Sequence, residues 1–368
     1  MKKISKSIFL VLFAIAAITN FAKASEEHAV ADTLSPKKFN TGDLIFNHIK
    51  DSYVWHITAI GHTEISIPLP IILYSQQSGF HLFMSGKFHH GTEAYDGFKI
   101  ATEGQYQRKI VEVMADGSEV RPWDFSITKN VTSLFVSIII LLMIFISIAK
   151  RYSENFARAP KGIQSWIEPI VIFVRDDIAI PSIGKEKYEK YLPYLLTIFF
   201  FILINNVMGL IPLFPGGANL TGSISITLVL ALFTFVITSI SGSRDYWVHI
   251  VNAPGIPWWL KFPMPLMPIV EIMSVFLKPF VLTIRLFANI TAGHIIALGF
   301  YCMIFIFAEM SPFAGYGISV VSIIFTVFMS ILELLVAFIQ AYVFTLLSAI
   351  YIGMALENHK VHAEAEVN

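Results

Sequence analysis

The sequence predicts an all-α membrane protein with five transmembrane helices, the last two forming a long tilted hairpin, together with an exported N-terminal extension. Hydrophobic residues make up 55% of the 368 residues and charged residues only 14%, a composition typical of multi-span membrane proteins. Long apolar stretches recur in the second part of the chain, and the charges cluster between them. The single cysteine, Cys302, excludes an intrachain disulfide framework.

Residues 1–24 are predicted to be a signal peptide. A lysine-rich start, an apolar stretch from Ile8 to Ile18 and the small-residue site Ala22-Lys23-Ala24 follow one another, which is the order of a secretory signal. The mature chain would then begin at Ser25. An uncleaved anchor helix is the alternative, although the apolar stretch is shorter than the ~20 residues that a membrane span requires.

Residues 25–127 are predicted to form an exported (periplasmic) segment that is partly β. Residues 62–68 alternate in polarity, and Ser78-Gly79 and Asp116-Gly117 are turn signals. Seven histidines fall in this segment, including the pair His89-His90, but their spacing matches no zinc template. We therefore interpret them as solvated surface residues.

Residues 128–368 are predicted to be the membrane domain, with five helical stretches. These are Val131–Ala149, Tyr191–Ile211, Ile224–Ile240, a fourth from about Pro265 to Ala308 and a fifth from about Tyr316 to Leu356. Each of the last two holds about forty residues, or about 60 Å at 1.5 Å per residue, twice the ~30 Å hydrocarbon thickness. These two helices must therefore tilt strongly or kink, as Pro279 suggests.

The charge distribution predicts the topology. The loop between the first two spans carries eight lysines and arginines, and the positive-inside rule puts such a loop in the cytoplasm. The signal peptide independently puts the N-terminus outside, and alternation through five spans leaves the C-terminus in the cytoplasm.

Arg285 is the most informative residue, because it lies in an apolar stretch long enough to be inside a bilayer. An arginine there costs roughly 2.5–3.5 kcal/mol at mid-helix and keeps its charge. Glu271, Lys278, Arg285 and Ala292 recur every seven residues, so they lie nearly in one line. Ala288 and Asn289 widen this line into a surface that another helix could approach closely. The alternative is intrachain packing, with Arg285 held by a buried acid.

The last helix carries a second polar face formed by Glu333, Gln340, Phe344 and Tyr351. If Ser311-Pro312 is the apex of an antiparallel hairpin, residues at equal chain distance from it lie at similar depth. This register matches Arg285 with Gln340 and His294 with Glu333. His294 and Glu333 would form a proton-exchangeable pair beside a permanent cation, which favours a proton relay.

The stretch from Lys278 to Asn289, followed by Ala292-Gly293-His294, resembles the signature helix of subunit a of the F-type ATP synthase. Its Arg-Leu-Phe-Ala-Asn core begins at Arg285. Asn205-Asn206 in the second span and Asn219-Leu220-Thr221 before the third are also similar to the family's polar positions. Many bacterial members carry an acid at the position of His294 and a histidine at that of Glu333, so the two groups are exchanged in this chain.

The resemblance implies a non-catalytic, proton-translocating stator subunit of a bacterial inner membrane, because the nucleotide chemistry of the family lies in other subunits. Protons would enter through a half-channel lined by Asn206, His294, Glu333 and Gln340, with Asn289 also on the path. They would leave through a cytoplasmic half-channel near Glu271, and Arg285 would separate the two. The implied partners are a ring of small ion-binding subunits, a peripheral-stalk subunit, the rest of the complex and membrane lipid, with no cofactor, metal or nucleic acid.

Two other functions are compatible with intramembrane charges. A secondary transporter would show paired broken helices in two halves, and the sequence has no evident internal repeat. An intramembrane enzyme would need a catalytic motif, and the chain has no His-Glu-x-x-His, no Gly-x-Ser-x-Gly and no phosphate-binding glycine loop.

Overall fold

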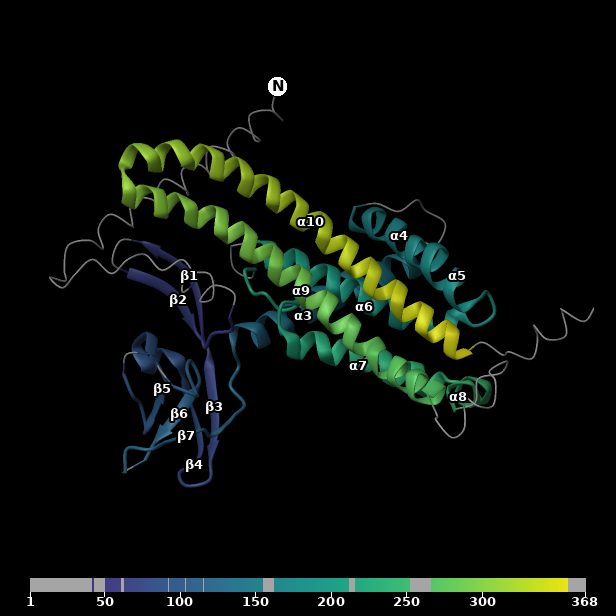
Figure 1. The fold of residues 1–368 in the computed structure, drawn as a ribbon, viewed down its shortest axis with the longest axis horizontal. Helices are drawn as coiled ribbons and strands as arrows, with labels where there is room; N and C mark the ends of the chain where they lie inside the picture. Colours follow the sequence, from purple (N-terminus) through teal and green to yellow (C-terminus); the bar gives the residue numbers. More distant parts are fainter. Residues whose placement is uncertain are drawn as a thin grey trace, which may run out of the picture. The chain divides into compact units, whose positions relative to one another are not determined.

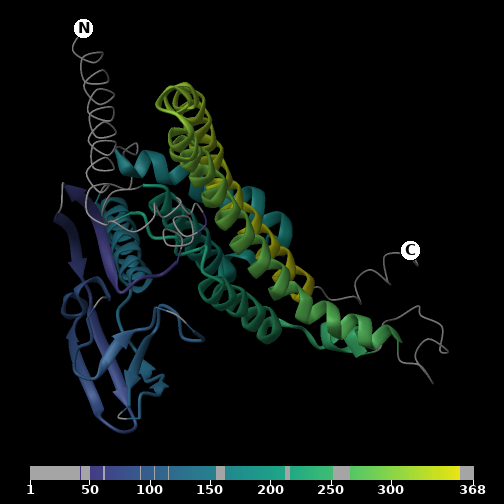
Figure 2. The same ribbon diagram turned by 60° about the vertical axis from the view of Figure 1, so that its left-hand side comes forward.

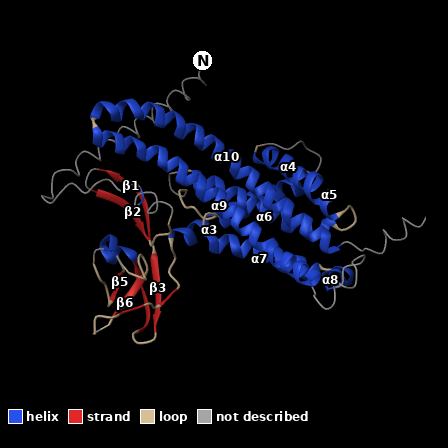
Figure 3. Ribbon diagram, viewed as in Figure 1, coloured by secondary structure: helices blue, strands red, loops and turns tan. Residues whose placement is uncertain are grey.

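The computed structural model describes residues 42, 50–60, 63–91, 93–102, 104–114, 116–154, 162–211, 216–251 and 266–356. The chain divides into two compact units. Described residues of the first lie within Asp51–Lys129, and those of the second lie mainly within Asn130–Asn368. The strands belong to the first unit and the long helices to the second (Figure 3). The predicted signal peptide lies outside the described residues.

The N-terminal unit is built from short antiparallel sheets. Strands β1 (Val54–Ile60) and β2 (Thr63–Pro68) form a hairpin. A second sheet has the order β4-β3-β8, from Gly79–Met84, Pro70–Ser75 and Trp123–Asp124. A third has the order β5-β6-β7, from Phe98–Ile100, Ile110–Val113 and Glu119–Val120. A 3-10 helix, η2 (Ser85–Gly91), follows β4. The partly β character predicted for this segment is therefore confirmed.

The core of this unit is small and rich in large side chains. It consists of Tyr53, Ile71, Leu73, Phe88, Phe98 and Ile110. Strand β3 contributes every second residue to it, as the period of a strand requires. One buried charge, Glu112, accepts hydrogen bonds from the hydroxyl groups of Ser75 and Ser78, which is how a carboxylate can be buried without large cost.

Among its described residues, the second unit contains five helices that are long and apolar enough to cross a membrane, as predicted. These are α3 (Lys129–Glu154), α6 (Tyr188–Leu210), α7 (Ile224–Ser241), α9 (Leu266–Met310) and α10 (Pro312–Leu356). Helices α9 and α10 lie side by side as a long antiparallel hairpin (Figures 1 and 2). Each has 45 residues, so the prediction of two unusually long final helices is confirmed.

The hairpin turns within a single residue, and α10 begins earlier than the predicted Tyr316. The Ser311 hydroxyl accepts a hydrogen bond from the amide of Ala314, so Ser311 caps the helix. Pro312 then occupies the first helical position, where its missing N–H is harmless. Gly315 lets the two helices meet, because a Cβ there would lie 2.9 Å from the Cα of Ala308. Ser311-Pro312 is therefore the apex of the hairpin, as predicted, and it is also the start of α10.

The stretch of residues 163–183 between the first two spans is helical, whereas the sequence was interpreted there as a charged loop. It contains α4 (Ile163–Phe173), the π-helix η3 (Val174–Ala179) and α5 (Ile180–Ile183). Val174, Ile178 and Ala179 are fully buried. The charges of this stretch hid the pattern, because Glu168, Arg175, Asp176 and Asp177 lie among apolar positions that face the bundle.

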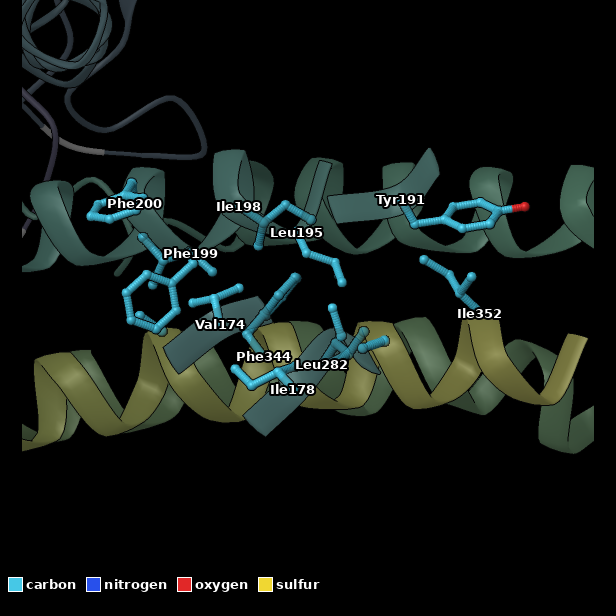
Figure 4. Close-up of a cluster of buried hydrophobic side chains, with 14 of the residues drawn as sticks. Val174, Ile178, Tyr191, Leu195, Ile198, Phe199, Phe200, Leu282, Phe344 and Ile352 are labelled. Carbon is cyan, nitrogen blue, oxygen red and sulfur yellow. The ribbon is translucent and has the colours of Figure 1, made fainter. Parts of the chain in front are cut away.

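The core of the second unit lies where η3 meets α6, α9 and α10 (Figure 4). Leu195 and Phe199 of α6, Leu282 of α9 and Phe344 of α10 are at most 2% exposed. Polar groups also link the helices: the Thr234 hydroxyl of α7 bonds Tyr194 of α6 at 2.9 Å and Ser348 of α10 at 3.1 Å. These bonds satisfy hydroxyl groups that would otherwise be buried without partners.

The end of α10 is held by two contacts with other segments. The Lys187 ammonium donates a hydrogen bond of 3.1 Å to the carbonyl of Leu356, as a cation at a helix C-terminus should. The amide of Ser243, just before α8 (Arg244–Val251), donates to the carbonyl of Ala355 at 2.9 Å. The last helix is thus fixed at the end of its membrane span.

Candidate functional site

The buried polar centre of the hairpin is a contact between His294 of α9 and Glu333 of α10. The Nδ1 atom of His294 meets the Oε1 atom of Glu333, and the two side chains are only 14% and 7% exposed. The hairpin register predicted from chain distances therefore holds for this pair. An imidazole and a carboxylate in contact can exchange a proton.

Two glycines make room for this pair. A Cβ at Gly293 would lie 3.1 Å from Oε1 of Glu333, so the glutamate lies directly against the backbone of α9. A Cβ at Gly209, near the end of α6, would lie 3.8 Å from Nε2 of His294. The imidazole therefore has Glu333 on one ring nitrogen and the end of α6 beside the other. From the sequence, Gly293 was known only as part of the resemblance at Ala292-Gly293-His294, and its spacing role is visible only in the structure.

Asn206 lies in the same region, one helical turn before Gly209. Its amide Nδ2 donates to the carbonyl of Ala337 in α10 at 3.2 Å, and its Oδ1 accepts a 2.6 Å hydrogen bond from the Thr221 hydroxyl. Ala337 is one turn beyond Glu333, so the asparagine is close to the buried pair along α10. Asn206 thus joins α6, α10 and the segment before α7 with both ends of its side chain.

Gln340 accepts a hydrogen bond from Asn289, with 2.9 Å between Nδ2 and Oε1. The sequence had placed Gln340 at the same depth as Arg285. Its hydrogen-bond partner is one turn further along α9, at Asn289. Gln340 itself is buried and only 2% accessible.

Arg285 is exposed on the surface of the hairpin, as are Ala288 and Ala292. Within the part of the chain that the structure describes, its side chain forms no hydrogen bond or ion pair. The alternative of a buried acid holding Arg285 is therefore wrong for the described residues. A bare guanidinium among small side chains is a surface that a second ionisable group can approach.

Glu271 and Lys278 lie on the other side of Arg285 along α9. Both are half-buried, and the Glu271 carboxylate interacts electrostatically with Lys278 and with Tyr246 of α8. The Lys278 ammonium lies 5.3 Å from the centre of the Tyr351 ring. A surface hollow of about 390 Å³ adjoins Lys278 and Tyr351. Along the helix, Glu271 is about 35 Å from His294, so the polar groups form two separate clusters with Arg285 between them.

The described residues include no group of three or more histidine, cysteine, aspartate or glutamate side chains that could hold a metal ion. Two pairs of polar groups, His294 with Glu333 and Asn289 with Gln340, instead bridge the two helices of the hairpin.

The sequence matches two protein families. Residues 131–353 match the ATP synthase A chain, and residues 44–125 match a domain of unknown function (DUF8433). The chain is 45% identical over 260 residues to ATP synthase subunit a 2 of Chlorobaculum tepidum, which covers 68% of this chain and 69% of the relative. It is 41% identical over 252 residues to ATP synthase subunit a of Chloroherpeton thalassium (67% and 71%) and 40% identical over 239 residues to that of Myxococcus xanthus (63% and 74%). The chain is a multi-pass membrane protein that belongs to the ATP synthase subunit a family.

Proposed function

We propose that this chain is the stator subunit of an ATP synthase membrane sector, in which two proton half-channels meet a rotating ring of small subunits. The observation that carries the proposal is the exposed, unpaired Arg285 between two polar clusters of the hairpin. The ring, a peripheral-stalk subunit and the rest of the synthase are the proposed partners. Coupled proton flow would drive rotation and hence ATP synthesis.

The first half-channel ends at the pair of His294 and Glu333. A proton would pass by Asn206, reach the imidazole or the carboxylate, and continue past Gln340 and Asn289 to a carboxylate of the ring. The contact between Nδ1 and Oε1 supports this step, because transfer between the two groups needs no rearrangement of the helices. Once protonated, the ring carboxylate is neutral and can enter lipid without the large cost of a buried charge.

The second half-channel would lie near Glu271. A ring carboxylate that has turned almost full circle must lose its proton to water, and the half-buried Glu271 beside Lys278 offers a hydrated polar path. Each charge moved through 100 mV supplies about 2.3 kcal/mol, so several protons are needed for each nucleotide.

Arg285 would keep the two half-channels apart. Its fixed positive charge favours the ionised form of a passing carboxylate and repels a proton that crosses directly. The role requires a cation that no internal acid neutralises, and the lack of an ion pair to Arg285 among the described residues supports it. The exposed Ala288 and Ala292 allow the ring helix to come close.

We also infer the orientation of the chain in a bacterial inner membrane. Residues 1–24 would be removed as a signal peptide, residues 25–127 would lie outside and the C-terminus would lie in the cytoplasm. Amino-terminal analysis of the membrane-inserted protein should give Ser25 as the first residue. Retention of Met1 would contradict cleavage.

The decisive experiment replaces Arg285 in the assembled complex. In inverted vesicles, Arg285→Ala should abolish ATP-driven proton pumping and coupled synthesis, while passive proton conductance persists or rises. Arg285→Lys should also fail substantially, because an ammonium group can be deprotonated in apolar surroundings. Arg175→Ala is the matched control, because it removes an exposed arginine that is bonded to Asp176 outside the predicted spans. Normal coupled synthesis in Arg285→Ala would refute the proposed barrier.

A further inference from the structure

The sheet β4-β3-β8 of the N-terminal unit carries large apolar side chains on both faces. One face carries Ile71 and Leu73 into the core of the unit. The opposite face carries six large apolar side chains that are 47–65% exposed. They are Tyr74, Phe80, Leu82, Met84, Trp123 and Phe125. Antiparallel sheets normally alternate between an apolar inner face and a polar outer face, so this sheet departs from the usual pattern.

The strand register shows that these side chains form one continuous surface. Tyr74 is paired with both Phe80 and Trp123, so the three side chains lie side by side across the sheet. The same register pairs Ile72 with Leu82 and Pro70 with Met84, and Phe125 donates its amide to the carbonyl of Ile72. No residue at these outward positions carries a charge. Contiguous apolar surfaces of this kind mark interaction sites.

The same sheet leads directly into the first membrane helix. The chain that forms β8 continues beside β3, where the amide of Ile127 donates to the carbonyl of Pro70 at 3.0 Å. Helix α3 begins two residues later at Lys129, whose amide donates to the carbonyl of Ser52 at 2.8 Å. Phe125 is four residues from the helix start and therefore within about 14 Å of it. This short connection keeps the Phe125 end of the apolar face close to the start of α3.

We propose that the outward face of β4-β3-β8, which we call the sheet face, lies on the lipid headgroup region of the membrane. The six exposed side chains that define it combine tryptophan and tyrosine with phenylalanine, leucine and methionine. Tryptophan and tyrosine are enriched at the membrane–water interface because their rings are amphipathic. A covalent tether also gives the face a high effective concentration of lipid, so even a modest affinity keeps it bound.

The proposal makes a geometric demand that can be tested. Pro70 and Met84 lie at the end of the sheet nearest α3, and Phe80 lies four residues further along β4. At about 3.4 Å per residue this is a distance of about 14 Å. A sheet that lies on the bilayer brings all of β4 into the interface, whereas an upright sheet leaves Phe80 in water.

The test uses the full-length chain in the assembled complex, reconstituted in phosphatidylcholine vesicles that contain spin-labelled lipid. Cys302, the single cysteine of the chain, is first replaced by alanine. An environment-sensitive fluorophore is then attached to Phe80→Cys, Leu82→Cys or Met84→Cys. Gln107→Cys is the matched control, because Gln107 is an exposed turn residue of the same unit, away from the sheet face.

All three β4 labels should show blue-shifted emission and quenching, stronger with spin labels near the headgroup than with labels deep in the acyl chains. This follows because interfacial binding buries an apolar face by only about 5–10 Å. The Gln107→Cys label should emit as in water. High salt should leave the quenching unchanged, since the face carries no charge.

Three outcomes would overturn the proposal. Solvent-like emission at all β4 labels would show that the sheet face is exposed to water. Quenching confined to Met84→Cys would show an upright sheet. A blue shift without lipid quenching would show that protein covers the face. Every labelled side chain is exposed, so labelling is not expected to unfold the unit. Trp123→Ser should lower the quenching at Leu82→Cys without unfolding the unit.

Discussion

Gly293→Ala should selectively impair proton flux, because the added methyl group would lie against Glu333. The new Cβ would be 3.1 Å from Oε1, 3.3 Å from Cδ and 3.4 Å from Cγ. Ordinary carbon contacts lie at about 3.5–4.0 Å, so the carboxylate must move by a few tenths of an ångström. Its room to move is small, because Oε1 also contacts His294 and the side chain is only 7% exposed.

The size of the effect follows from the cost of overpacking. Extra methyl groups in a well-packed interior typically cost about 1–3 kcal/mol. If that cost falls on the conducting arrangement, proton flux should fall roughly 5- to 150-fold, since each 1.36 kcal/mol is a factor of ten in rate. The measurement is ATP-driven acidification of inverted vesicles, normalised to the amount of assembled complex.

Gly299→Ala is the matched control on the same helix. A Cβ at Gly299 meets nothing within 4 Å, and glycine-to-alanine replacement within a helix gains roughly 0.5–1 kcal/mol of helix stability. Gly299→Ala should therefore assemble normally and pump at the normal rate. Equal pumping by the two variants would refute the reasoning, because it would mean that the Glu333 position does not limit flux.

Three further predictions concern other contacts. The exchange His294→Glu with Glu333→His should recover more flux than the product of the two single losses, whereas strictly multiplicative effects in assembled complexes would show that the groups act separately. Gly353→Ala should prevent stable assembly, measured as complex yield, because its Cβ would lie 1.9 Å from a backbone carbonyl oxygen of α5; normal yield would contradict this close approach. Burial, aided by the bond to Asp124, raises the pKa of Tyr53, so the N-terminal unit should keep its stability below about pH 10 and lose it as the pH rises further. Tyr53→Phe should flatten that loss in urea unfolding of the full chain between about pH 8 and pH 11, and an unchanged pH dependence would exclude Tyr53 as its source.

The sequence predicted the membrane helices well because the hydrocarbon core imposes a simple rule of length and polarity. The same rule failed between the first two spans, where α4, η3 and α5 mix charges with buried residues such as Val174. The helix start at Pro312 was missed because a proline can stop the helix that precedes it and can also occupy the first position of the helix that follows. In both places the structure depends on which residues pack against each other, and the periodicity of the sequence does not carry that information.

Part of the candidate site could also be predicted from the sequence. Equal chain distances from the hairpin apex correctly brought His294 and Glu333 together, because two straight antiparallel helices preserve such distances. The same argument put Gln340 at the depth of Arg285, and the hydrogen-bond partner of Gln340 is Asn289, one turn away on α9. One turn is about 5.4 Å, and only the direction of each side chain decides between neighbours at that scale.

The close contact at Gly293 also affects a variant in which His294 and Glu333 are exchanged between α9 and α10. In this chain the glutamate on α10 extends against α9 at a position that lacks a side chain. With the groups exchanged, the imidazole would stand on α10, and its ring carbon would occupy the space where Cγ of Glu333 now lies, 3.4 Å from a Cβ at Gly293. A rigid ring can adapt less than a flexible glutamate, so the exchanged protein should depend more strongly on the glycine. Adding Gly293→Ala to the exchange variant should therefore lower flux by a larger factor than it does in the native background, and an equal factor would show that the glycine serves helix packing alone.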